Sequence, residues 1–219
     1  LKINNEIPLG KGCGSSAAAR LAGIALAVPF GKLRWSDSRI VGEASRREHH
    51  TDNAAACWLG GLAIARQISE NEAQVATIQP KQKWPLLMAI PAEPLSTEEA
   101  RRVLPEQYSR ADAVVNIQNS MLLLAGLTQG KPDILASALH DRLHEPYRAT
   151  LCPLLSPLQE LAGESGVLGA VLSGAGPSVL LIAEEAAVAA LPAIVRQTAA
   201  DPTLEIIQTR IAAGTVVQK

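Results

Sequence analysis

The sequence predicts an α+β fold, because segments with strand-like and helix-like patterns alternate along the chain. No internal repeat or low-complexity stretch interrupts this alternation. After Pro94 the patterns become mainly helical, and 219 residues suffice for one large domain or two small ones. We therefore expect two domains, residues 1–82 and 83–219, which meet near residues 80–85.

The first 90 residues are predicted to hold three helices and three strands. A serine N-cap at Ser15 or Ser16 begins the first helix, which runs to about Val28 because Pro29 follows. Further helices are expected over residues 36–47 and 52–58, and strands over 61–67, 74–78 and 86–90.

The remainder of the chain is predicted to begin with a helix at Ser96, because Glu99 follows at the spacing of a capping box. Helices are then expected over 110–127, 134–143 and 184–199, with a strand over 204–211. Residues 166–183 carry no charge, yet the Ser-Gly-Ala-Gly-Pro-Ser run at 173–178 divides them. This predicts two strands joined by a loop, and no membrane span.

Charge and cysteine content narrow the classes of partner. With 20 basic and 21 acidic residues the net charge is -1, and only 3% of residues are aromatic. Neither a broad positive field nor a platform for base stacking is indicated, so we expect no nucleic-acid or membrane partner. Cys13, Cys57 and Cys152 lie far apart without C-x-x-C spacing, which favours a reducing cytoplasm over a disulfide framework or a zinc site.

The most informative segment is a glycine-rich loop at residues 8–17, Pro-Leu-Gly-Lys-Gly-Cys-Gly-Ser-Ser-Ala. Glycines at alternate positions let successive backbone N–H groups turn toward one anion. The two serines stand where a helix should begin, and its N-terminal dipole faces the same point. The loop therefore predicts a site for a nucleotide triphosphate.

Other glycine-rich loops compete with this interpretation. A Walker loop is excluded, because Lys11 precedes the last glycine. The dinucleotide fingerprint fits Gly12-x-Gly14-x-x-Ala17 with Asp37 as the ribose-binding acid, but it must follow a buried strand, and residues 1–8 carry four polar residues and end in proline. A plain Gly-Ser turn that opens an alanine-rich helix is the remaining alternative.

Three motifs occur in one order: the loop at residues 8–17, Asp52-Asn53 followed by Gly60-Gly61, and the run at 173–178. Together they resemble the GHMP kinases, small-molecule kinases named for galactose, homoserine, mevalonate and phosphomevalonate. Residues 95–105 and 143–148, the latter Leu-His-Glu-Pro-Tyr-Arg, are similar to segments of the homoserine kinase branch.

The resemblance implies a two-domain fold. Its N-terminal domain is like domain 2 of ribosomal protein S5, and its C-terminal domain is a ferredoxin-like α/β plait. Family members carry a further segment before the glycine loop, so we expect the N-terminal domain to be truncated here, where the chain opens on Leu1.

The activity that the resemblance implies is the ATP-dependent phosphorylation of L-homoserine to O-phospho-L-homoserine, in threonine biosynthesis and with Mg²⁺ as cofactor. The partner is then a small-molecule substrate, and a homodimer is common in the family. Two alternatives stay open: another GHMP kinase with a different alcohol substrate, and a non-catalytic nucleotide- or metabolite-binding relative or inactive fragment.

By resemblance, the nucleotide phosphates bind at the glycine loop, for which the candidate residues are Pro8, Gly10, Lys11, Gly12, Cys13, Gly14, Ser15, Ser16 and Ala17. Magnesium prefers oxygen ligands and takes few from protein, so the resemblance assigns it to the Ser16 hydroxyl and the Glu43 carboxylate. Glu48 is the second choice, and a solvated helix glutamate is the alternative for Glu43. Cys13 departs from the leucine usual in the family.

His50, Asp52 and Asn53 match the His-x-Asp-Asn pattern of the homoserine kinase branch. In the mevalonate branch a catalytic aspartate precedes the Gly-Gly pair by seven residues, and here Asn53 holds that position. An amide cannot take a proton at neutral pH. The implied mechanism is direct attack of the substrate hydroxyl on the γ-phosphate, with Asn53 and His50 orienting it. A polar surface pair of histidines is the alternative.

The resemblance also indicates how the amino-acid substrate is held. Arg148 is the candidate for its carboxylate, because a guanidinium is a rigid two-pronged donor, and His144 is expected to help. Arg210 is a weaker candidate, with an ordinary exposed arginine as the alternative. Gly174 and Gly176 belong to the turn at residues 173–178, which in the family packs against the phosphate loop.

Overall fold

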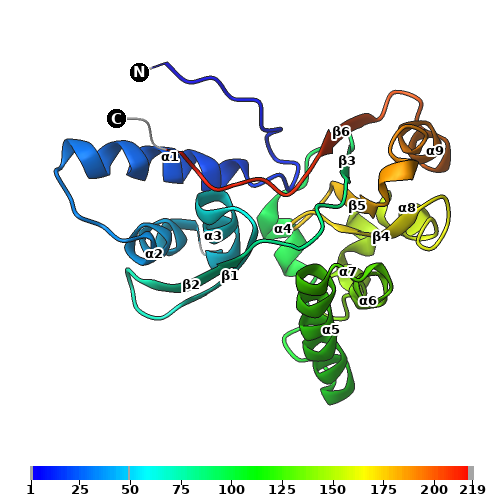
Figure 1. The fold of residues 1–219 in the computed structure, drawn as a ribbon, viewed down its shortest axis with the longest axis horizontal. Helices are drawn as coiled ribbons and strands as arrows, with labels where there is room; N and C mark the ends of the chain where they lie inside the picture. The colour runs from blue at the N-terminus through cyan, green and yellow to red at the C-terminus, as the bar shows by residue number, and fades with distance from the viewer. Residues whose placement is uncertain (1, 49, 217–219) are drawn as a thin grey trace. The chain divides into compact units, whose positions relative to one another are not determined.

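The computed structural model describes residues 2–48 and 50–216, and the chain divides into two compact units (Figure 1). The first unit comprises the described parts of residues 1–7, 14–80 and 211–219, and the second comprises Pro8–Cys13 and Lys81–Arg210. The glycine loop therefore contributes residues 8–13 to the second unit and residues 14–17 to the first. The assignment of family domains to residues 1–82 and 83–219 stays a prediction.

In its described residues, the first unit contains three helices and a hairpin. They are α1 (Ser15–Phe30), α2 (Asp37–Glu48), α3 (Thr51–Leu59), β1 (Leu62–Gln67) and β2 (Ala73–Ile78), and the two strands are antiparallel. Small buried side chains let α3 pack on α2 and on β1, and the shared core includes Leu21, Ile40, Val41, Ala44, Ala54, Ala55 and Ala73. Gly42 is needed where α2 meets the β1–β2 turn, because a Cβ there would lie 2.4 Å from the carbonyl oxygen of Asn71.

The last described residues of the chain return to this unit. The N–H groups of Gly61 and Thr215 donate to the carbonyl oxygens of Ala212 and Trp58, both at 2.9 Å. The Thr215 hydroxyl also donates to the Cys57 carbonyl at 2.9 Å. These bonds fasten residues 212–215 along the C-terminal end of α3.

The second unit is a four-stranded sheet of β3 (Leu86–Ile90), β4 (Val167–Leu172), β5 (Val179–Ala183) and β6 (Glu205–Thr209). Its order is β4-β5-β3-β6, and all neighbours are antiparallel. The helical connections join β3 to β4 and β5 to β6, which is the arrangement of a ferredoxin-like plait. The predicted fold class is confirmed in this unit.

The helices of the second unit are α4 (Thr97–Arg102), α5 (Arg110–Gln129), α6 (Pro132–Ala138), α7 (Glu145–Arg148), α8 (Leu155–Gln159) and α9 (Leu191–Thr198), with 3-10 turns η1 (Ala149–Leu151) and η2 (Glu185–Ala187). Buried leucines and valines from β3, β4, β5, α8 and α9 form its core. Ser96 caps α4 by accepting from the N–H of Glu99 at 3.0 Å, as predicted.

Two predicted helices are wrong in their extent. The helix expected over 134–143 is α6, which begins at Pro132, since proline needs no N–H in a first turn, and ends at Ala138. The helix expected over 184–199 is confined to Leu191–Thr198, because Pro192 lies in its first turn and cannot continue a helix from the preceding residues.

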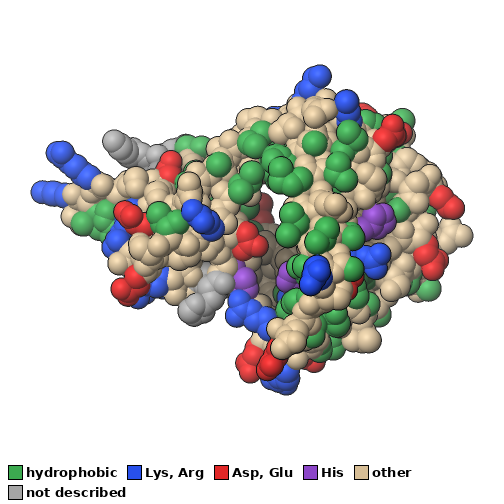
Figure 2. Space-filling model, turned by 90° about the horizontal axis from the view of Figure 1, so that it is seen from below, with side chains coloured by type: hydrophobic (Ala, Val, Ile, Leu, Met, Phe, Trp, Pro, Cys, Tyr) green, Lys and Arg blue, Asp and Glu red, His purple; other side chains and the backbone are tan. Residues whose placement is uncertain are grey.

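The strands at residues 167–172 and 179–183 confirm the strand–loop–strand prediction. Across residues 2–48 and 50–216, no helix has the length and apolarity to cross a membrane. Figure 2 shows acidic and basic side chains interspersed over the face that it presents.

The dinucleotide alternative is wrong, since no strand forms within residues 2–8 and Asp37 accepts a hydrogen bond from the indole N–H of Trp58 at 2.8 Å.

Candidate functional site

The glycine loop has the backbone conformation that its sequence predicts. Gly10, Gly12 and Gly14 have φ values of 70°, 78° and 76°, a left-handed region that disfavours residues with a Cβ. Gly14 is the N-cap of α1, and its carbonyl accepts from the N–H of Ala18 at 3.0 Å, so the serine N-cap expected at Ser15 or Ser16 is wrong. Because glycine has no side chain that could cap the helix, the first-turn N–H groups can meet an anion.

Within the second unit, the loop is fastened to the turn at residues 173–178. The Ser173 hydroxyl donates to the Gly12 carbonyl at 2.9 Å, and the Ser178 N–H donates to the Lys11 carbonyl at 3.4 Å. A Cβ on Gly12 would lie 2.2 Å from the Ser173 carbonyl oxygen and 2.7 Å from that of Gly176. Residues 10–13 and 173–178 therefore pack backbone to backbone.

Lys11 and Cys13 also have defined surroundings in the second unit. The Lys11 ammonium donates to the carbonyl oxygen of Pro91 at 3.0 Å and to that of Ala92, just beyond β3. The Cys13 thiol is half-buried and lies 3.9 Å from the Lys11 carbonyl. Burial raises the pKa of this thiol, so its neutral form prevails at pH 7.

The two candidate magnesium ligands lie in the first unit. Ser16 is in the first turn of α1, and its Oγ accepts from the Arg20 guanidinium at 2.8 Å. Glu43 is only 6% exposed, so it is not a solvated helix glutamate. Its carboxylate accepts from Arg46 at 2.8 Å and from Arg47 at 3.0 Å.

The ionisation of Glu43 suits a metal ligand. The hydrogen bond from Arg46 lowers the pKa of its carboxyl group, although burial acts the other way. Carboxylate and hydroxyl oxygens are the ligands that Mg²⁺ prefers, so Glu43 and Ser16 fit this ion by chemistry. On binding, the ion would take the place of the Arg20 guanidinium at the Ser16 hydroxyl and of the arginine contacts at the Glu43 carboxylate. The side chain of Glu48, the second choice, lies outside the described residues.

The His-Thr-Asp-Asn segment forms the start of α3 in the first unit. His50 is the N-cap residue with φ -137°, and its carbonyl accepts from the N–H of Ala54 at 3.3 Å. Asn53 lies in the first turn, where its N–H donates to the Asp52 carboxylate at 2.9 Å. The half-buried Asn53 amide is thus carried by a helix that is packed into the core of its unit.

Arg148 ends α7 in the second unit and is only 8% exposed. Its Nε donates to the Ala100 carbonyl at 3.0 Å, and its Nη1 donates to the Gly174 carbonyl at 3.4 Å. Burial lowers the pKa of this guanidinium, yet an arginine stays charged at neutral pH. The structure therefore brings together Arg148, Gly174 and Gly12 around the turn at 173–178.

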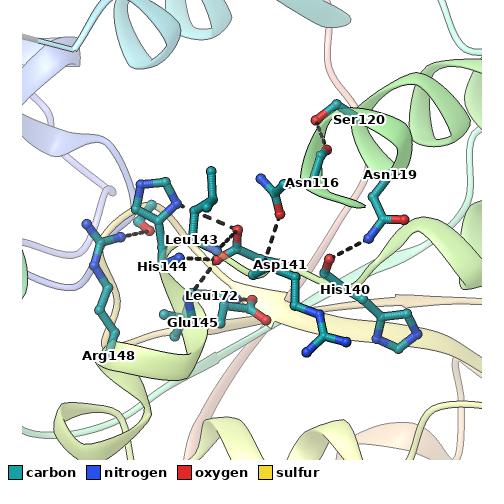
Figure 3. A network of polar contacts seen from close by, with 12 residues as sticks. Asn116, Asn119, Ser120, His140, Asp141, Leu143, His144, Glu145, Arg148 and Leu172 are labelled. Atoms are coloured by element: carbon teal, nitrogen blue, oxygen red, sulfur yellow. Dashed lines mark hydrogen bonds and ion pairs between the residues drawn. The ribbon is translucent and has the colours of Figure 1, made fainter. Parts of the chain in front are cut away.

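The segment before Arg148 is organised by an aspartate that the sequence did not single out. Asp141 accepts from the N–H groups of Leu143 at 3.1 Å and of His144 and Glu145 at 2.6 Å (Figure 3). Burial alone would raise the pKa of Asp141, but these bonds and the nearby His144 imidazole hold it well below its usual range. The signal for this residue is an aspartate just before a Glu-Pro helix start, which is a capping pattern.

Helix α5 fixes the same segment from a second side. The Asn116 side-chain oxygen accepts from the N–H of Arg142 at 2.9 Å, and the Asn119 amide donates to the His140 carbonyl at 2.7 Å (Figure 3). His144 itself is exposed, with its Nδ1 3.7 Å from the Asp141 carboxylate. The sequence carries no local signal for the two asparagines, because their partners are 21 and 26 residues away.

Arg210 has partners of a different kind. Its guanidinium forms a two-pronged ion pair with the Glu185 carboxylate at 2.6 and 2.8 Å and donates to the Lys83 carbonyl at 2.8 Å. These contacts tie the end of β6 to η2, and the pair is solvent-exposed. They resemble those of an ordinary surface arginine, and a substrate contact for Arg210 stays a prediction.

Comparison with known proteins gives one family for both units. Residues 1–61 match the family described as GHMP kinases N terminal domain, and residues 123–201 match GHMP kinases C terminal. A curated homoserine kinase from Solibacter usitatus is 44% identical over 184 residues, which are 84% of this chain and 60% of that protein. The chain spans about 60% of the length of the curated relatives that it matches.

Solved structures of two similar proteins have a similar fold. A homoserine kinase from Cytophaga hutchinsonii has a TM-score of 0.82 at 24% identity, over 95% of this chain and 68% of that one. A putative homoserine kinase from Listeria monocytogenes has a TM-score of 0.77 at 25% identity, over 96% and 71% of the two chains.

Proposed function

The chain belongs to the GHMP kinases, and from this premise we propose that the protein transfers the γ-phosphate of ATP to the hydroxyl group of L-homoserine. The products are ADP and O-phospho-L-homoserine. One observation in the second unit supports this most directly: Arg148 and Gly12 both contact the turn at residues 173–178. A donor for a substrate carboxylate then lies beside the phosphate loop, as phosphorylation of an amino acid requires.

The nucleotide side of the reaction uses backbone groups. We propose that the N–H groups of Gly12, Gly14, Ser15 and Ser16 hold the phosphates, aided by the dipole of α1. Bound Mg²⁺ supplies neutralisation of the phosphate charge, and the Ser16 hydroxyl and the Glu43 carboxylate are the side chains that would hold it.

The acceptor side needs orientation more than activation. In phosphoryl transfer the transition state is loose, so a hydroxyl attacks without a strong base. We propose that Arg148, helped by His144, binds the substrate carboxylate, while Asn53 and His50 align the hydroxyl. The Asn53 amide cannot accept a proton, which leaves it a hydrogen-bonding role.

The setting of this activity is also a proposal. We place it in threonine biosynthesis and in the cytoplasm, where the three free thiols Cys13, Cys57 and Cys152 would stay reduced. A homodimer stays a prediction.

An assay of ADP release tests the function. It compares L-homoserine, mevalonate and galactose as acceptors, with this chain and with the full reading frame that contains it. We expect rapid ADP release with homoserine alone. Rapid turnover of mevalonate without turnover of homoserine would overturn the assignment, and nucleotide binding without turnover of any acceptor would favour a non-catalytic relative.

Exchanging Glu43 for glutamine tests the magnesium proposal. Because a bond to a charged group contributes about 1.5–3 kcal/mol, E43Q should raise the Mg²⁺ concentration for half-maximal activity about 10- to 100-fold. Magnesium titrations of the initial rate measure this. Glu98→Gln is the matched control, since Glu98 also pairs with an arginine on its own helix, Arg102, at 3.3 Å but is exposed. An unchanged Mg²⁺ dependence in E43Q would refute a ligand role.

A further inference from the structure

Glu145 is a buried acid to which the proposed reaction gives no part. It begins α7 and is only 7% exposed. Its Oε1 accepts from the N–H of Leu172 at 2.7 Å, and its Oε2 accepts from the Gln159 amide at 2.9 Å. A buried carboxylate is costly unless such bonds satisfy it. Burial raises the pKa of Glu145 and the Leu172 N–H opposes this shift.

The backbone partner of Glu145, Leu172, lies where strand β4 leads into the turn at residues 173–178. Leu172 is the last residue of β4, and the next residues open the turn at 173–178. Arg148, three residues after Glu145 in the same helical turn, donates to the carbonyl of Gly174. Residues three apart share one face of a helix, so one turn of α7 holds the chain both before and after Ser173. Figure 3 shows Glu145 and Arg148 on this turn, together with Leu172.

Ser173 extends this connection to the glycine loop. Its hydroxyl donates to the Gly12 carbonyl at 2.9 Å, and its own carbonyl lies where a Cβ on Gly12 would be only 2.2 Å away. Ser173 is also held by its N–H, which donates to the Ser178 carbonyl at 2.9 Å. A shift of residues 172–174 would therefore move two contacts together: the packing of Ser173 on Gly12, and the Gly174 carbonyl to which Arg148 donates.

We propose that Glu145 is a positioning residue. Its carboxylate fixes the backbone of residues 172–174 and thereby positions both the Arg148 guanidinium, which contacts Gly174, and Gly12, which packs on Ser173. This inference rests on the proposed function for its effect on homoserine, but its structural part does not. Glu145 acts through the backbone of Leu172 and not by touching a substrate.

The chain offers variants that separate the acceptor from the charge. In Glu145→Gln the amide oxygen can still accept from Leu172, and Gln159 can turn its own amide to accept from the new NH₂ group. In Glu145→Met the acceptor is lost, while a flexible unbranched side chain fills the site with little strain. Glu160→Met is the control, since Glu160 is exposed at the end of α8.

Amide hydrogen exchange gives a readout that needs no activity. In E145M we expect the Leu172 and Ser173 amides to exchange about tenfold faster or more, since one lost hydrogen bond is of that size. The KM values for ATP and for L-homoserine should rise together by about tenfold. E145Q should stay within about threefold of the natural protein in both measurements, because the Leu172 N–H keeps an acceptor, and E160M should match it.

Three results would overturn the proposal. The first is an E145M protein that loses thermal stability while its exchange at residues 172–173 and both KM values stay unchanged, which would make Glu145 merely structural. The second is a KM change for one substrate only. The third is an E145Q protein as impaired as E145M. If the natural protein does not turn over homoserine, the proposed function fails, whereas exchange and binding of a non-hydrolysable ATP analogue still decide the role of Glu145.

Discussion

Replacement of Arg148 by methionine is expected to raise the KM for L-homoserine by about 100-fold or more, because a charged two-pronged bond to a carboxylate contributes several kcal/mol. The KM for ATP should rise much less, since Ser173 keeps its own bond to Gly12. Steady-state kinetics with each substrate varied in turn measure the two effects. This split distinguishes Arg148 from Glu145, for which both constants should rise together.

Two further variants sharpen the test of Arg148. Arg148→Lys keeps a charge but loses the planar fork, so its KM for homoserine should fall between those of the natural protein and R148M. Arg142→Met is the control, because Arg142 is exposed on the same segment and bonds Asn116 through its backbone. Equal increases in the two KM values of R148M would show that Arg148 supports the turn and does not bind the substrate.

The success and failure of sequence reasoning at this site follow from the range of the contacts. Alternating glycines specify their own backbone conformation, so Gly10, Gly12 and Gly14 were predictable one residue at a time. The pairing of Glu43 with Arg46 and Arg47 also obeys helical spacing.

Contacts between distant segments leave no such pattern. Glu145 meets Leu172 across 27 residues, and Ser173 meets Gly12 across 161. The identity of these residues does not indicate their partners. A glutamate in a first helical turn, for example, is common because it interacts favourably with the helix dipole. The prediction of the extent of α6 failed for a related reason. Periodicity alone continued this helix to residue 143, whereas Asp141 organises residues 143–145 into the start of a new helix.

Gly12 is constrained both by its backbone conformation and by contacts with a distant segment, and its replacement by alanine is expected to weaken nucleotide binding about 100-fold. The φ of 78° disfavours a Cβ by about 1–2 kcal/mol. The carbonyl oxygens of Ser173 and Gly176, at 2.2 and 2.7 Å from that atom, cannot yield as a flexible side chain would. The loop must therefore shift, and a misplacement near 1 Å costs about 100-fold in function.

Gly163→Ala separates the effect of backbone strain from that of the steric clash. Gly163 has a φ of 83° but nothing within 4 Å of an added Cβ, so this variant carries the conformational strain without the clash. Urea unfolding should show G163A losing about 1–2 kcal/mol of stability, with its affinity for an ATP analogue unchanged in calorimetry. G12A should lose at least as much stability and about 100-fold in affinity. If G12A bound the analogue as tightly as G163A, the close packing of the loop on residues 173–178 would not be required for the nucleotide site.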